Sequence, residues 1–128
     1  MRSDMASEPA ANLSAAEVLT EATRRAARIL GLPDPALAQV LGVDPGALQA
    51  GGGVSELDSP AGERASLFLR AFRDLHALAG DSESCRRWMA TENATLRGVP
   101  GELIRSGEGL RKVADYLEAA RTERPLTR

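Results

Sequence analysis

The chain has 128 residues, a formal net charge of −2, one cysteine and four aromatic side chains. This length suits a single domain, or one small domain with a separable subdomain. Cys85 is the single cysteine, so it forms no internal disulfide framework and favours a reducing compartment. The sequence shows neither a run of roughly 20 apolar residues, as a membrane span needs, nor a signal-peptide pattern. We therefore expect a cytoplasmic protein.

Charge is distributed unevenly along the chain. Residues 1–63 hold four basic and nine acidic side chains, a net charge of −5, whereas residues 64–128 hold twelve basic and nine acidic ones, a net charge of +3. Because affinity for nucleic acid depends on neutralising phosphates with lysine and arginine, DNA binding by the first half would act against an unfavourable field.

The N-terminal region predicts a tail followed by one helix. Residues 1–13 are rich in alanine and serine without periodicity, which predicts a disordered tail. Ser14 and Glu17 have the spacing of a capping box, and Gly31 marks the end of the helix that this box begins. The side chains expected on its buried stripe are Val18, Ala22, Ala26 and Leu30 or Ile29.

Two short helices and a connector are predicted next. Asp34-Pro35 and Asp44-Pro45 each combine an N-cap acceptor with proline at the first helical position, which predicts helices over about 35–41 and 45–50. The three glycines at 51–53 predict a flexible connector that continues to residue 58.

Ala38, Gly42 and Leu48 have the spacing of a helix-turn-helix, which would place the helix over 45–50 in a DNA major groove. The alternative is that two short helices simply meet at a turn. No arginine or lysine lies between Asp44 and Gly51, so phosphate contacts would have to come from arginines outside this helix or from a second subunit. The candidate DNA contacts are Arg24, Arg25 and Arg28 for phosphates and Gln49 for a base edge.

The second half predicts four more helical segments, over about 60–79, 83–91, 102–105 and 107–121. No segment alternates polar and apolar residues, so we expect an all-α fold. A short helix-turn-helix-like subdomain over 14–58 would precede a small helical domain over 59–128. The core that holds the last helix is expected to contain Trp88, Met89, Leu96, Ile104, Leu110, Val113 and Leu117.

The turn residues in this half have ordinary structural explanations. Asn93 and Gly98 suit a turn, Pro100 suits a helix start, and Ser106 suits an N-cap. Their order, however, resembles the C-terminal toxin-binding domain of the Xre/MbcA/ParS family of antitoxins, which are partners of RES-domain toxins. The residues that carry the resemblance are Glu63-Arg64, Trp88, Asn93, Leu96, Gly98, Pro100, Glu108-Gly109, Val113 and Leu117.

The resemblance implies an antitoxin that forms a homodimer, covers the active-site pocket of an NAD-degrading toxin, and represses its own operon by binding promoter DNA. The helix over 45–50 departs from the family pattern because it lacks basic and aromatic residues. The resemblance fades after Leu117, so the remaining tail is not mapped residue by residue.

Charged side chains near the last helix are the candidate toxin contacts. Carboxylates would suit the cationic pocket of an NAD-binding toxin, and basic groups would suit acidic residues at its rim. The alternative is an ordinary solvated helix face. The acidic candidates are Glu102 and Glu108, with Asp115 and Glu118 beside them, and the basic candidates are Arg105, Arg111, Lys112, Arg121, Arg124 and Arg128.

The sequence offers few residues for a catalytic or metal site. His76 and Cys85 are the sole histidine and cysteine, whereas a zinc site uses three or four protein ligands. We therefore expect a protein that is not an enzyme and needs no cofactor. Two alternatives to an antitoxin stay open: a stand-alone helix-turn-helix regulator, and a scaffold that binds a partner other than a toxin.

Overall fold

The computed structural model describes residues 14–127, with the side chains of residues 14–123. The predicted tail over 1–13, Arg128 and the side chain of Arg124 lie outside this description. Within it the chain forms helices and no strand, which confirms the all-α class. The helices are α1 (Ala15–Leu30), α2 (Asp34–Leu41), α3 (Pro45–Gln49), α4 (Pro60–Ala79), α5 (Ser82–Ala90), α6 (Pro100–Leu103) and α7 (Gly107–Thr127).

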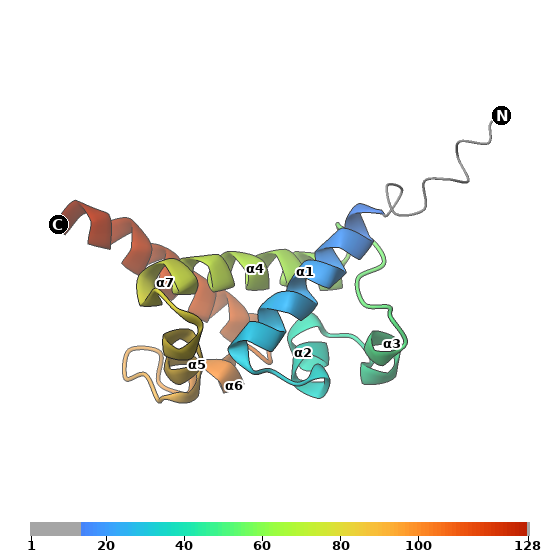
Figure 1. Ribbon diagram of the computed structural model, residues 1–128, viewed down its shortest axis with the longest axis horizontal. Helices are drawn as coiled ribbons and strands as arrows, with labels where there is room; N and C mark the ends of the chain where they lie inside the picture. The colour runs from blue at the N-terminus through green and yellow to red at the C-terminus, as the bar shows by residue number, and fades with distance from the viewer. Residues whose placement is uncertain (1–13, 128) are drawn as a thin grey trace.

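Helix α4 is the centre of the fold. It packs against α1, α2, α5 and α7, and its most extensive contact is with α7. In Figure 1, α4 runs along the length of the molecule, with α2 and α3 toward one end and α5 toward the other. None of the described helices is long and apolar enough to cross a membrane.

The bounds of α4 follow from its sequence. The Ser59 hydroxyl accepts a hydrogen bond from the Gly62 backbone N–H at 3.0 Å, Pro60 occupies the first turn, and the helix ends at Gly80. Phe68, Ala71 and Leu75 lie on its buried face at helical spacing, with Phe72 and Ala79 half-buried beside them.

The predicted buried stripe of α1 was wrong at Val18, which is 54% exposed, and at Ala22, which is only half-buried. Thr20 and Thr23 occupy the buried face instead, because their hydroxyls donate to the carbonyls of Ala16 and Thr20 at 2.9 and 2.7 Å. A threonine satisfied by its own helix can be buried at little cost, so the stripe is rotated toward these residues.

The α2–α3 region has the contacts that its spacing predicts. Ala38 and Leu48 are fully buried, and Gly42 ends α2 in the left-handed conformation at φ +73°. The Arg64 guanidinium of α4 lies against Gly42, where a Cβ atom would be 2.5 Å from Nη1. That this pair is a DNA-binding helix-turn-helix stays a prediction.

The connector after α3 is attached to α1. The Val54 backbone N–H donates to the Thr20 hydroxyl at 3.0 Å, and the Val54 side chain is buried. Buried hydrophobic side chains from both sides of the connector form one continuous core. The division into regions 14–58 and 59–128 stays a prediction.

Helix α7 begins at a capped turn and extends past its predicted end at residue 121 to Thr127. The Ser106 hydroxyl accepts from the Gly109 backbone N–H at 3.0 Å, so Ser106 caps the helix as predicted. Residues 110–124 contain neither glycine nor proline, so the sequence favours a helix that continues past residue 121 up to Pro125.

Two glycines at the start of α7 should respond differently to alanine. A Cβ atom at Gly109 would lie 1.9 Å from the backbone oxygen of Leu103, whereas one at Gly107 would meet the movable end of Arg64 at 2.8 Å. We expect Gly109→Ala to lower the free energy of unfolding by about 2 kcal/mol, and Gly107→Ala to change it by less than about 1 kcal/mol. Urea unfolding followed by circular dichroism measures both, and equal effects would contradict the packing described here.

Candidate functional site

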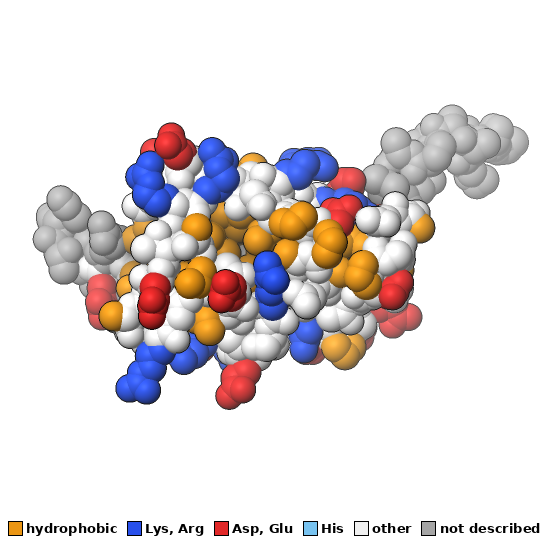
Figure 2. All heavy atoms as spheres, turned by 90° about the horizontal axis from the view of Figure 1, so that it is seen from below, with side chains coloured by type: hydrophobic (Ala, Val, Ile, Leu, Met, Phe, Trp, Pro, Cys, Tyr) orange, Lys and Arg blue, Asp and Glu red, His pale blue; other side chains and the backbone are white. Residues whose placement is uncertain are grey.

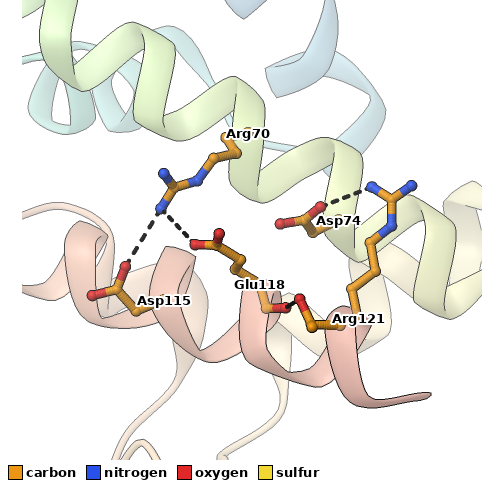
Figure 3. Close-up of polar contacts among 6 residues, drawn as sticks. Arg70, Asp74, Asp115, Glu118 and Arg121 are labelled. Atoms are coloured by element: carbon orange, nitrogen blue, oxygen red, sulfur yellow. Dashed lines mark hydrogen bonds and ion pairs between the residues drawn. The ribbon is translucent and has the colours of Figure 1, made fainter. Parts of the chain in front are cut away.

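Two sets of ion pairs join α4 and α7 across their packed faces (Figure 3). Arg70 of α4 extends to Asp115 and Glu118 of α7, with nitrogen–oxygen distances of 3.4 Å to each. In the opposite direction, Arg121 of α7 donates to the Asp74 carboxylate at 2.8 Å. The pairs flank the apolar contact and fix the register of α7 along α4.

The Asp74–Arg121 pair was not predicted from the sequence. Asp74 is only 7% exposed, so its carboxylate depends on Arg121 for a charged partner. Its position three residues after the buried Ala71 was the available signal, since helical spacing places both on the same face.

The predicted core around the last helix is confirmed except at Trp88. Trp88 is half-buried at the edge of this core, where its ring stacks on Tyr116 with centroids 6.2 Å apart. The two rings border an apolar hollow of about 200 Å³ between α4, α5 and α7. Tyr116 was missed because one aromatic residue beside a buried stripe has no distinguishing pattern. The confirmed core residues are Met89, Leu96, Ile104, Leu110, Val113 and Leu117.

The loop between α5 and α6 is organised by Asn93. Its side-chain oxygen accepts from the Leu96 backbone N–H at 3.0 Å, and its backbone N–H donates to the Gly98 carbonyl at 2.8 Å. A Cβ atom at Gly98 would lie 3.2 Å from the Leu103 side chain, so the glycine serves close packing. Pro100 is buried at the start of α6. These positions of the predicted motif hold the fold of the domain.

The candidate contacts on the last two helices are mostly exposed. Glu108, Arg111 and Lys112 lie one turn apart on α7, and Glu102 and Arg105 lie on α6 and just after it. Arg121 differs, because it is held by Asp74. The structure therefore presents a set of solvated charges of both signs around the start of α7.

The candidate DNA contacts do not form one cationic surface. Arg24 donates to the Leu48 carbonyl at the end of α3. Arg24, Arg28 and Gln49 line an open hollow of about 740 Å³, and the acidic residues Glu17 and Glu21 line it as well. Arg25 is exposed and is not part of this hollow. On the face shown in Figure 2, acidic and basic side chains are interspersed around hydrophobic ones that gather across the middle.

His76 and Cys85 are not placed for joint chemistry. His76 packs beside Phe72 with ring centroids 5.8 Å apart, whereas Cys85 is fully buried in α5. Burial, reinforced by the negative charge of Asp81, raises the pKa of the Cys85 thiol, which disfavours the reactive thiolate. Within residues 14–123, no three His, Cys, Asp or Glu side chains are grouped to hold a metal ion.

Removal of Arg121 should expose the dependence of Asp74 on its partner. We expect Arg121→Ala to lower the free energy of unfolding by about 1–2 kcal/mol, because a buried carboxylate is left without its ion pair. The loss should be smaller in an Asp74→Asn background, and Arg111→Ala serves as the exposed control on the same helix. Thermal and urea unfolding measure the free energy of unfolding of the two single variants and the double variant. If the two single losses add up to the loss in the double variant, the pair does not couple the helices.

Residues 74–122 match the family model of the antitoxin Xre/MbcA/ParS C-terminal toxin-binding domain. The matched segment runs from the last turns of α4 through α5 and α6 into α7, and it contains Asp74, Trp88, Asn93 and Arg121. The match shows that this segment is similar to the domain through which antitoxins of that family bind a toxin. No curated protein matches the chain.

Proposed function

We propose that this chain, whose residues 74–122 are similar to an antitoxin's toxin-binding domain, neutralises a RES-domain toxin by covering its NAD-binding pocket. The match over residues 74–122 carries the proposal, because it spans α5, α6 and most of α7, together with the end of α4 on which α7 packs. The RES partner is supported by the order of turn and core residues from Trp88 to Leu117, which resembles antitoxins of that pairing.

The proposed contact surface is the exposed side of α6 and the first turns of α7. Glu108, Arg111 and Lys112 project there without ion pairs among the described residues. Carboxylates on this surface would meet the cationic groups that bind NAD phosphates, and its basic groups would meet acids at the pocket rim. The opposite side of α7 is already occupied by α4, so it is not available to a toxin.

Neutralisation is tested by co-expression with the toxin encoded in the adjacent reading frame. We expect the wild-type chain to restore growth, and Arg111→Glu/Lys112→Glu to bind the purified toxin at least about tenfold more weakly, because both reversals change charges at the proposed surface. Arg25→Glu on α1 is the matched control, since Arg25 is exposed outside the toxin-binding domain. Toxicity that the wild-type chain does not relieve would refute the antitoxin assignment.

Repression of its own operon is a further part of the proposal and requires a homodimer. The exposed face of α3 presents Pro45, Gly46, Ala47 and Gln49, which include no cation. A single subunit would therefore bind DNA weakly, and two half-sites would have to act together.

Operator binding should therefore be strongly sensitive to salt and protein concentration. We expect a gel shift of promoter DNA at low ionic strength that weakens as salt rises, and that is reduced by Gln49→Ala, because Gln49 is the exposed side chain of α3 able to read a base edge. Lys112→Ala on α7 is the control, because Lys112 is not among the candidate DNA contacts. If no shift occurs at low salt, repression by this chain is refuted.

A further inference from the structure

Arg97 is the one non-glycine residue with a positive φ angle among the residues that the structure describes. Its φ of +63° lies in the left-handed region, which is disfavoured for residues with a Cβ atom and least costly for glycine or asparagine. Arg97 belongs to the loop between α5 and α6, at the edge of the molecule in Figure 1. The loop thus has an arginine where its backbone favours glycine.

The turn does not need the Arg97 side chain for its own structure. The Arg97 backbone N–H donates to the Asn93 carbonyl at 2.8 Å, and the Asn93 side chain caps Leu96. Neither bond involves the Arg97 side chain, so any residue that accepts the left-handed conformation would complete the same turn.

The neighbouring glycine does not relieve this strain. Gly98 has no positive φ angle, and it is held small by the Leu103 side chain, 3.2 Å from where its Cβ atom would be. The glycine therefore lies where packing requires it, and the strained position next to it is left to Arg97.

The Arg97 side chain is exposed, and within the described part of the chain it forms no hydrogen bond or ion pair. Its contacts inside the protein therefore do not compensate for the strained backbone. Strained backbone that packing does not require is concentrated at functional sites, where the side chain serves an external contact. A guanidinium is suited to a carboxylate, which it binds through two parallel hydrogen bonds.

We propose that Arg97 is a contact residue of the toxin-binding domain and pairs with an acidic side chain on the surface of the toxin. This inference rests on the proposed function and extends it, because it adds the α5–α6 loop to the contact surface on α6 and α7. At position 97 the backbone conformation favours glycine, whereas toxin binding would require arginine, so stability and binding can be measured separately.

The test is Arg97→Gly in the full chain, with binding to the toxin of the adjacent reading frame measured by calorimetry and stability by thermal unfolding. We expect binding to weaken roughly tenfold, as for loss of a charge-assisted pair, while the melting temperature stays equal or rises by a few degrees. Arg97→Asn should weaken binding similarly, because asparagine tolerates the turn without a cation. Arg25→Ala controls for the loss of any exposed arginine.

Three results would overturn the proposal. Unchanged affinity of Arg97→Gly, with a wild-type chain that binds, would show that the toxin does not contact Arg97. A lower melting temperature for Arg97→Gly would show that the side chain has a structural role instead. A wild-type chain that binds no toxin would refute the proposed function, and the role of Arg97 with it.

Discussion

The packing of α7 along α4 is the contact on which the remaining structure depends. Leu110, Val113 and Leu117 are buried at this contact, and the ion pairs from Arg70 and Arg121 flank it. Burial provides most of the stabilisation. The exposed pairs of Arg70 contribute little energy, whereas Arg121 supplies the charged partner of the buried Asp74 carboxylate. With α7 held in one register, its other side is left exposed in a defined orientation, which is what a binding surface requires.

Local signals in the sequence predicted the helices well, because their ends depend on neighbouring residues. Proline after an acceptor placed the starts of α3 and α4 correctly, and Gly80 placed the end of α4. The buried face of α1 was not predictable in the same way, because burial of Thr20 depends on Val54, which is distant in sequence. The pairing of Asp74 with Arg121 is likewise a tertiary contact that spacing alone does not reveal.

The sequence predicted which segment forms the candidate site better than it predicted which side chains contact a partner. At Asn93, Gly98 and Gly109, backbone geometry and close packing restrict which residue types fit. Such restrictions give a recognisable order of residues in the sequence. Exposed charges such as Glu108 and Lys112 have no comparable restriction inside the chain, so their selection depends on a partner. The strained φ angle of Arg97 has no signal in the sequence and became visible only in the folded backbone.

The position of Arg64 links regions that the sequence suggests are separate. Its guanidinium lies beside Gly42 at the end of α2 and beside Gly107 at the start of α7, so one side chain fills the space next to both. A side chain at Gly107 and a side chain at Gly42 would each have to displace this same guanidinium, so the effects of the two substitutions should not be additive. Positions 42, 64 and 107 therefore form an epistatic unit, in which the tolerance of one half of the chain depends on the residue chosen in the other.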